Sequence, residues 1–228
     1  MYVMRGPVGN YDNDSKVDLN ITAVGSNHLL RNLGNGKFAD VTAKAGVADP
    51  GFSSSALWFD YDNDGKLDLF VAHYIEWSIE TDQYCSLDNK NKSYCTPQRY
   101  KGQSATLFHN KGNGTFENVT KRAGLYDPSG KSLGVAMLDY DNDGWMDLLV
   151  TNDTEPNKPY PNNHNGTFTD VAEQAGVAGG NDSTAIVSDA IWFDYDNDGL
   201  PVLVVARFGT PILYHNVGHG KFKDVAVG

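Results

Sequence analysis

Four aspartate-rich loops carry the residues with the clearest chemistry in this sequence of 228 residues. In the loops Asp60–Asp68 and Asp139–Asp147, Asp stands at positions 1, 3, 5 and 9, and Gly stands at position 6. Alternate side chains of so tight a loop converge on one point, and hard oxygen ligands at this density suit Ca²⁺. An EF-hand would need a bidentate Glu at position 12, where Val71 and Val150 stand. The pattern therefore predicts calcium loops within β-hairpins rather than EF-hands.

The predicted ligands are the side chains at positions 1, 3, 5 and 9 and the backbone carbonyl at position 7. They are Asn10, Asp12, Asp14, Lys16 and Asp18; Asp60, Asp62, Asp64, Lys66 and Asp68; Asp139, Asp141, Asp143, Trp145 and Asp147; and Asp194, Asp196, Asp198 and Leu200. The first loop has Asn10 and Ser15 in place of Asp and Gly, so we expect weaker binding there. The fourth loop has Val202 in place of the ninth Asp and is expected to bind most weakly. We expect three to four Ca²⁺ ions with a structural role.

The charge balance supports bound cations. The formal net charge is −11, and the four loops contribute a large share of the 29 acidic residues. Aspartate-rich turns without a cation are the alternative, but crowding so many like charges destabilises a fold unless cations neutralise them. The same acidity argues against nucleic acid as a partner, and no apolar run is long enough for insertion into a membrane.

A second block follows each loop, and together the two blocks define a repeat. Turns such as Asn35-Gly and Asn113-Gly join short apolar strands, which is a strong hairpin signal. Short strands, regular turns and a period near 50 residues predict an all-β fold, a β-propeller with four-stranded antiparallel blades. The expected blades are residues 1–48, 49–125 with an insertion at 76–104, 126–177 and 178–228. Pro159 and Pro161 interrupt one expected strand and suit an edge or a bulge.

Other residue types give weaker signals. None of the six histidines lies at ligand spacing from another His or Cys, so His109 and His215 are interpreted as strand positions rather than zinc ligands. Trp58 and Trp192 share a repeat position and are expected in blade cores, although a sugar platform is the alternative.

The two cysteines bear on the compartment. Cys85 and Cys95 lie ten residues apart, a spacing that fits neither a redox motif nor a zinc ribbon. A local disulfide is the expected state, with two free thiols in a reducing compartment as the alternative. A disulfide would indicate an extracellular, cell-surface or periplasmic location. Residues 1–10 contain no hydrophobic region, so a signal peptide is not expected within the sequence as given.

The combined motifs resemble FG-GAP/VCBS repeats, and more narrowly the cartilage acidic protein/UnbV-type family. The resemblance rests on the aspartate loop, the following Asn-x-Gly-Asn-Gly-x-Phe-x-Asp-Val-Thr block and the Ala-Gly-Val ending, and it covers nearly the whole chain. It implies an integrin α-like propeller with calcium in its loops, in secreted or cell-surface proteins. Because such propellers usually have six or seven blades, the four repeats here are expected to be part of a larger propeller, closed by remaining blades or by a neighbouring chain, with a closed four-bladed ring as the alternative.

Three functions are compatible with these residues. The first is an extracellular binding or scaffold module, stabilised by calcium, for a protein or glycan partner. The second is a lectin-like glycan binder that uses the aromatic residues Trp77, Tyr84, Tyr94 and Tyr100 of the insertion. The third is a calcium-dependent enzyme acting on polysaccharides. The acidic residues recur in every unit, whereas a catalytic site should occur once, so we expect the protein not to be an enzyme.

Overall fold

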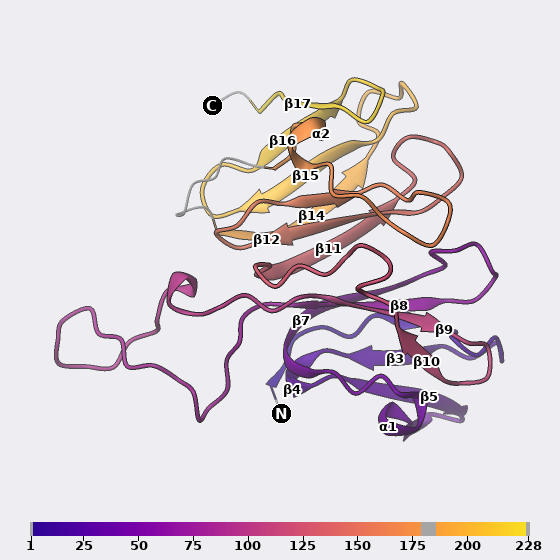
Figure 1. Ribbon diagram of the computed structural model, residues 1–228, viewed down its shortest axis with the longest axis horizontal. Coiled ribbons are helices and arrows are strands. Elements are labelled where there is room, and N and C mark those ends of the chain that lie inside the picture. Colours follow the sequence, from indigo (N-terminus) through magenta and orange to yellow (C-terminus); the bar gives the residue numbers. More distant parts are fainter. Residues whose placement is uncertain (1, 179–185, 227–228) are drawn as a thin grey trace.

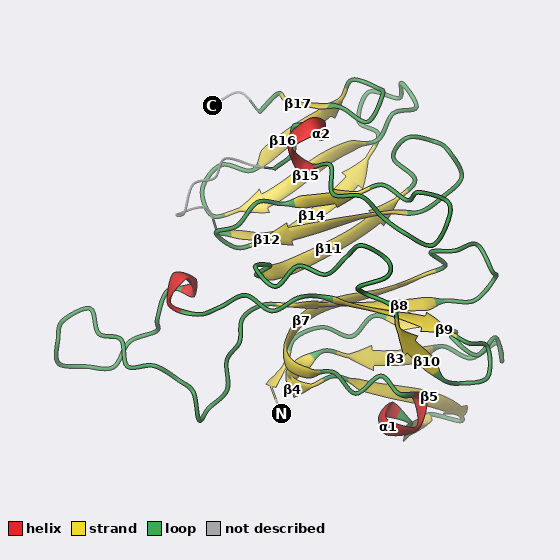
Figure 2. Ribbon diagram, in the orientation of Figure 1, coloured by secondary structure: helices red, strands yellow, loops and turns green. Residues whose placement is uncertain are grey.

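The computed structural model describes residues 2–178 and 186–226, which form antiparallel sheets stacked in the order of the sequence (Figure 1). The described residues are almost entirely strand and loop, with two one-turn helices, α1 (Thr42–Ala45) and α2 (Ala172–Ala175), and a 3-10 turn at Pro97–Arg99 (Figure 2). The prediction of an all-β fold is confirmed. The outer limits expected for the first and last blades, residues 1 and 228, lie outside the described residues.

Each sheet contains one aspartate loop between its first two repeat strands. The first sheet has the order β2 (Val8–Gly9), β3 (Asp18–Ile21), β5 (His28–Gly34), β6 (Lys37–Asp40). The second has β1 (Tyr2–Val3), β4 (Ala23–Ser26), β7 (Pro50–Phe59), β8 (Asp68–His73), β9 (Thr106–Asn110), β10 (Phe116–Asn118). The third has β11 (Ser132–Leu138), β12 (Asp147–Asn152), β13 (Lys158–Tyr160), and the fourth has β14 (Val187–Phe193), β15 (Val202–Arg207), β16 (Ile212–Asn216), β17 (Phe222–Asp224).

Two sheets differ from the expected four strands. The second has six, because β4 pairs with the free edge of β7 and β1 pairs with β4. The third has three, and its expected fourth strand is reduced to a single bridge between Asn162 and Phe168. Pro159 and Pro161 accept hydrogen bonds through their carbonyls from Val171 N and Thr169 N but have no N–H to donate. The prolines therefore shorten this ladder without abolishing it.

The hydrophobic core of the described residues consists of three clusters, each between two consecutive sheets. The Tyr at loop position 2 enters these clusters at Tyr11, Tyr61 and Tyr140. Trp58 stacks on Tyr11 with ring centroids 5.9 Å apart, and Trp192 stacks on Tyr140 at 6.0 Å. The interpretation of the two tryptophans as core residues is therefore confirmed, and the loops form part of the contact between sheets.

The Ala-Gly-Val segments close each contact between sheets. Ala45 and Val47 are buried in the cluster between the first and second sheets. The glycine between them ends α1 in the left-handed region, with φ of 75°, and Gly124 has the same backbone conformation at the end of a turn, with φ of 77°. A Cβ at Gly124 would lie 2.7 Å from the carbonyl oxygen of Phe168 in the next sheet. The motif requires glycine because the next sheet packs directly against this corner.

The last sheet ends the stack with an apolar face exposed. Ile191, Phe193 and Tyr195 are exposed there, and Tyr195 shows 49% of its surface although its equivalents are buried. At the inner edge, β7, β11 and β14 lie next to one another, and an ion pair joins Arg5 to Asp189 of the fourth sheet. The described units therefore form an arc whose outer face at the fourth sheet has no covering sheet among the described residues.

The insertion projects from the second sheet as a long loop between β8 and β9 (Figure 1). Cys85 and Cys95 form the predicted disulfide within it. Isolated β-bridges at Cys85–Ser93 and Ile75–Gly102 pair the outgoing and returning segments of the loop. Among the described residues, no helix has the length and apolar character needed to cross a membrane.

Candidate metal centres

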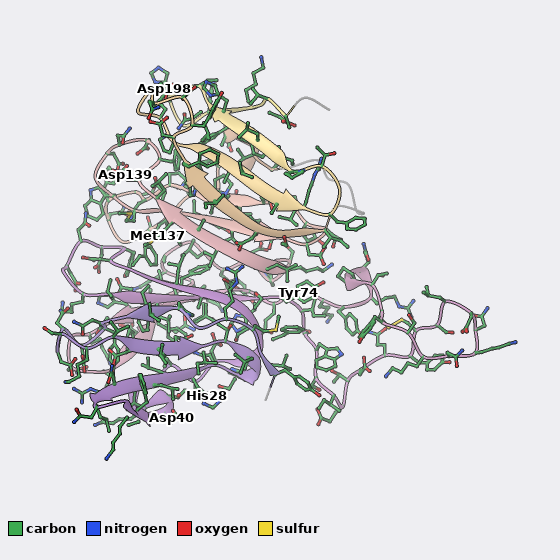
Figure 3. All side chains as sticks on the ribbon, turned by 180° about the vertical axis from the view of Figure 1, so that it is seen from behind. His28, Asp40, Tyr74, Met137, Asp139 and Asp198 are labelled. Atoms are coloured by element: carbon green, nitrogen blue, oxygen red, sulfur yellow. A yellow bond between two sulfur atoms is a disulfide. The ribbon has the colours of Figure 1, made fainter. Side chains whose placement is uncertain are left out.

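The four aspartate loops lie at one edge of the stack. They connect β2 to β3, β7 to β8, β11 to β12 and β14 to β15. Figure 3 shows Asp139 and Asp198 at the side of the molecule opposite the projecting insertion. The ends of corresponding strands meet at this edge because the two strands around each loop are paired antiparallel in every sheet.

The second and third loops each bring three of their four predicted carboxylates together, and Asp64 and Asp143 lie outside these two groups. Oxygens of Asp60, Asp62 and Asp68 lie within 4.8 Å of one another, and the third loop repeats this with Asp139, Asp141 and Asp147. Asp60 also folds its own loop, because its carboxylate accepts hydrogen bonds from Asp64 N (3.0 Å) and Gly65 N (2.8 Å). Oδ1 of Asp62 is buried without a hydrogen-bond partner. Such a convergent set of carboxylates with an unpaired buried oxygen fits Ca²⁺.

The ninth-position Asp has a second role. The side chain of Asp68 is fully buried and accepts hydrogen bonds from the backbone N–H of Asn110 (2.7 Å) and Tyr61 (3.2 Å). Burial raises the pKa of Asp68 to about 8, and it raises the pKa of the equivalent Asp147 to about 7. A bound cation would stabilise the ionised form of both groups. This position therefore connects the metal site to the strand that follows it.

The first loop differs from the others because basic side chains face its carboxylates. Arg31 Nε lies 2.6 Å from Asp12 Oδ2, and Arg31 Nη2 lies 3.3 Å from Asp14 Oδ2. Lys16 Nζ adds a contact of 2.8 Å with Asp14. Among the described residues, no group of three His, Cys, Asp or Glu side chains converges in this loop. The ion predicted for it stays a prediction, and Arg31 supplies a positive charge of its own.

The fourth loop is also different. Val202 is fully buried at the ninth position, where it offers no oxygen. Asp196 and Asp198 lie instead with His215 in a group whose ligand atoms are within 4.8 Å of one another. Asp194 is not in that group and accepts a hydrogen bond from Gly199 N (3.1 Å). The fourth loop therefore lacks the ninth carboxylate, as predicted. His215 lies beside Asp196 and Asp198.

A family model described as FG-GAP-like repeat matches residues 10–71, 94–150 and 139–205, which is most of the chain. The chain belongs to the FG-GAP-like repeat family. The FG-GAP-like chain is 43% identical to cartilage acidic protein 1 of Mus musculus over 54 residues, 24% of this chain and 8% of that protein. It is 34% identical to cartilage acidic protein 1 of Xenopus tropicalis over 95 residues, 40% of this chain and 14% of that protein. The predicted resemblance is confirmed, although the matches span a small part of the length of these relatives.

A solved structure is also similar to this FG-GAP-like chain. It is that of an Agrocybe aegerita lectin with specific recognition of non-reducing terminal N-acetylglucosamine, with a TM-score of 0.52. The match covers 96% of this chain and 51% of the lectin chain at 14% identity. At this identity the likeness shows a shared propeller-like fold, and it agrees with the sheet topology described above.

An asparagine in each of the second, third and fourth units links its unit to the aspartate loop of the preceding unit. Nδ2 of Asn110 donates to the carbonyl of Tyr11 in the first loop (2.8 Å), and Nδ2 of Asn162 donates to the carbonyl of Tyr61 in the second (2.8 Å). Asn216 repeats the contact with Tyr140 at 3.3 Å. These side chains are buried. Each of the first three loops is therefore fixed to the next sheet by a side chain that occupies the same repeat position.

The tips of the loops are also joined to one another. The Asn at position 4 adopts the left-handed conformation, with φ of 56°, 55° and 61° at Asn13, Asn63 and Asn142. Its Nδ2 donates to the carbonyl of the position-6 glycine of the next loop: Asn13 to Gly65, Asn63 to Gly144 and Asn142 to Gly199, at 3.3–3.4 Å. The four loops thus form a continuous hydrogen-bonded row, which we call the asparagine relay.

Replacing Asn110 with Ala is expected to destabilise the protein by about 2 kcal/mol or more, because the buried carbonyl of Tyr11 and the partly buried carbonyl of Leu67 lose their donor. Asn32 occupies the same repeat position, but its Nδ2 contacts only its own loop, at Val17. Asn32→Ala should therefore have a clearly smaller effect. Urea unfolding of both variants measures the difference, and equal losses would show that the contact between units contributes nothing.

Several site residues were not predicted from the sequence. Arg31, His109 and His215 share one repeat position, directly before the linking Asn, yet the two histidines were interpreted as strand positions only. The alignment of the FG-GAP-like units shows that these residues share a position, but it does not show that their side chains face the aspartate loops. The asparagines were visible in the repeat pattern, but their role depends on a neighbouring sheet.

Proposed function

We propose that this FG-GAP-like chain is a calcium-stabilised extracellular module that binds a protein or glycan partner. The observation that carries the proposal is the position of the buried ninth Asp. It lies within a carboxylate cluster and also accepts a backbone hydrogen bond from the Asn that holds the preceding unit. An ion in the loop would fix the angle between neighbouring sheets. Calcium therefore has a structural role in this proposal, and recognition takes place on another surface.

Binding is favoured over catalysis by the arrangement of two acids that do not repeat between units, Asp153 and Glu155. The hydroxyl of Tyr74 donates to Asp153, and Lys131 Nζ lies 3.3 Å from Glu155. Asp153 and Lys131 are buried; the first contact joins the second unit to the third, and the second contact lies within the third unit. A catalytic acid or base must reach its substrate, whereas these two side chains are enclosed by protein.

The proposed location is extracellular, cell-surface or periplasmic. The disulfide between Cys85 and Cys95 is typical of oxidising compartments. Extracellular calcium modules bind their ions with dissociation constants of about 10⁻⁴–10⁻³ M, which suits exposed loops such as these. The acidic net charge of −11 disfavours nucleic acid as a partner.

The exposed apolar face of the fourth sheet is the proposed closing surface of the propeller. Ile191, Phe193 and Tyr195 lie where the equivalent residues of earlier sheets pack against a following sheet. Remaining blades of a longer chain, or a neighbouring chain, would cover this surface. Either would bury the apolar side chains and complete the last contact between sheets.

Counting the bound ions tests the proposal. Elemental analysis after gel filtration in calcium is expected to give three Ca²⁺ per chain, because Arg31 and Lys16 already neutralise the first loop. Arg31→Ala removes the guanidinium from Asp12 and Asp14 and should raise the count by one. Lys37→Ala, a change of an exposed basic residue, should leave the count at three. A protein without bound calcium would overturn the proposed function.

Glycan binding is a second candidate, favoured by a pocket of about 650 Å³ between the insertion and the second sheet. Its lining includes Tyr2, Phe52, Trp77, Tyr94, Tyr100 and Asp82. Asp82 accepts hydrogen bonds from Trp77 Nε1 (3.0 Å) and the Tyr100 hydroxyl (3.2 Å), and it pairs with Lys92. Aromatic faces beside fixed polar groups suit a sugar ring, which has an apolar face and peripheral hydroxyls. The structural likeness to a glycan-binding lectin agrees with this candidate.

A glycan array is the test of this pocket. Trp77→Ala should weaken binding of any captured glycan by about tenfold or more, because it removes a central aromatic contact. Phe208→Ala changes an exposed aromatic residue outside the pocket lining and should leave binding unchanged. Binding that is equally strong in both variants would place the glycan elsewhere. If the array captured no glycan at all, that result would count against this candidate.

A further inference from the structure

One repeat position supplies a different side chain to each aspartate loop. This position directly precedes the linking Asn and holds Arg31, His109, Pro161 and His215 in the four units. Arg31 places its guanidinium against Asp12 and Asp14 of the first loop. The equivalent histidines therefore occupy a place from which a side chain reaches the carboxylates.

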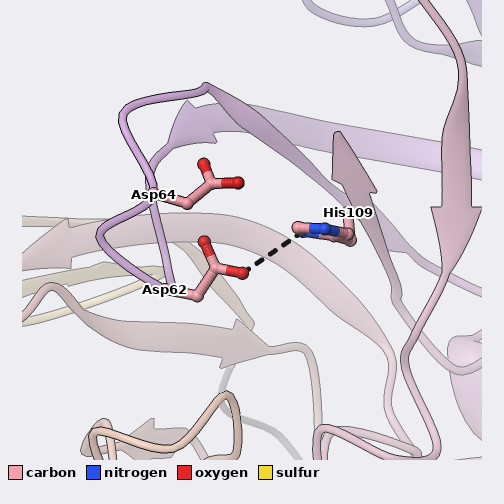
Figure 4. A group of neighbouring side chains, drawn as sticks. All are labelled: Asp62, Asp64 and His109. Carbon is pink, nitrogen blue, oxygen red and sulfur yellow. Dashed lines mark ion pairs between the residues drawn. The ribbon is translucent and has the colours of Figure 1, made fainter. Parts of the chain in front are cut away.

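His109 points its Nδ1 at the carboxylates of the second loop. That atom lies 3.4 Å from Asp62 Oδ2 and 3.3 Å from Asp68 Oδ1, and it is buried without a hydrogen bond to either. Ligand atoms of Asp62, Asp64 and His109 lie within 4.8 Å of one another (Figure 4). The ring of Tyr61 lies edge-on to the imidazole, with centroids 5.8 Å apart. The carboxylate oxygens and the imidazole nitrogen face one another without direct hydrogen bonds. Metal-ligating atoms are expected to be arranged in this way around a shared cation.

His215 repeats this geometry where the loop lacks its ninth Asp. Its Nδ1 is buried without a hydrogen-bond partner and lies 3.7 Å from Asp196 Oδ2. Asp196, Asp198 and His215 form a second group of the same composition. Tyr195 lies beside the imidazole at 6.0 Å, as Tyr61 does beside His109. The imidazole thus offers the donor atom that Val202 cannot.

The other two loops have no histidine at this position. Pro161 offers no ligand to the third loop, whose group of three consists of carboxylates only. His164 reaches Asp143 from a neighbouring turn, but it is 46% exposed and belongs to none of the metal groups of the described residues. The first loop already contains the charge of Arg31.

We propose that His109 and His215 are direct metal ligands that make the second and fourth loops mixed nitrogen–oxygen sites for a divalent transition-metal ion of the zinc type. Imidazole nitrogen binds zinc strongly, whereas all-oxygen sites suit calcium. The third loop is then a calcium site, and the second and fourth loops exchange calcium for zinc. This proposal goes beyond the structural role of calcium, because it assigns different preferred ions to loops that occupy equivalent positions in the repeat.

Zinc titration of the ¹⁵N-labelled full chain in excess calcium is the test. The ring nitrogens of His109 and His215 are expected to shift on saturation with two equivalents of Zn²⁺, as metal coordination at Nδ1 requires. His164 and His28 should shift little, because neither belongs to a metal group. Shifts confined to His164, or no shift in any of these histidines, would overturn the proposal.

Matched variants give a second measurement. His109→Gln and His215→Gln should each weaken one zinc site by at least about tenfold, whereas His164→Gln should leave both sites unchanged. Calcium content in the absence of zinc separates this proposal from the proposed function: bound calcium without histidine-dependent zinc binding would overturn only the zinc sites. Zinc affinity unchanged in the double variant His109→Gln/His215→Gln would also overturn them.

Discussion

The melting temperature of the protein is expected to fall by about 10 °C or more when calcium is removed, and the fall should be larger at about pH 8 than at about pH 5. Calcium that binds only the folded state stabilises it, and several loops contribute together. The pH dependence comes from Asp68 and Asp147. Burial raises the pKa of Asp68 from 3.8 to about 8 and that of Asp147 to about 7 in the protein without metal.

The direction follows from where the protons are held. Between the ordinary and the raised pKa, the folded calcium-free protein holds a proton on Asp68 that the unfolded chain has lost. Protonation therefore stabilises the calcium-free fold at low pH, and this contribution is lost as the pH rises towards about 8. Calcium requires the ionised carboxylate, so its affinity rises over the same range. The difference between calcium-loaded and calcium-free protein consequently grows with pH.

Differential scanning calorimetry on both forms measures this difference. The calcium-free form is best prepared on a chelating resin, because the affinity of a soluble chelator itself depends on pH. Magnesium added in place of calcium is the control, and we expect it to restore little stability because it prefers rigid octahedral sites. A calcium effect that is constant across the range would show that the buried carboxylates do not take part.

Asp68→Val is expected to lower the free energy of unfolding by about 3 kcal/mol or more in calcium, the second large effect. The change leaves the N–H groups of Tyr61 and Asn110 without their acceptor and removes a ligand. The fourth loop carries Val202 at this position, so the substitution has a natural precedent within the chain. Without calcium at about pH 8 the loss should be smaller, since the variant no longer buries an ionised carboxylate.

Asp68→Asn separates the two roles. The amide oxygen still accepts from Asn110 N, so most of the calcium-free stability should remain, while the calcium contribution falls. Urea unfolding with and without calcium provides all the required free energies. If Asp68→Val lost the same free energy in both conditions, the carboxylate would act only as a hydrogen-bond acceptor.

Much of the fold could be predicted because its signals are local. The Asn-Gly turns and the loop glycines determine hairpins through backbone preferences of adjacent residues. The additional strands of the second sheet could not be predicted. β4 pairs with β7 although two strands of the first sheet, β5 and β6, lie between them in the sequence. Pro159 and Pro161 did indicate an irregular ladder, since a missing N–H is a property of the residue itself.

The candidate site likewise combines contacts that the sequence predicts with contacts that it does not. The spacing of Asp60, Asp62 and Asp68 predicts their convergence, as they share one short loop. The contact between His109 and that loop joins residues more than 40 positions apart, across the disulfide-bearing insertion. The contact from Asn110 to Tyr11 spans 99 positions and joins two units. Such contacts depend on how the sheets stack, which no local pattern specifies.

The asparagine relay has a consequence for the shape of the calcium dose–response curve. Because Asn63 donates to Gly144 and Asn142 donates to Gly199, ordering one loop also positions the backbone of the next. Filling the second loop would then reduce the entropy lost when the third fills, which is positive cooperativity without any contact between ions. The module would respond to a narrow range of calcium concentrations, rigid above a threshold and loose below it.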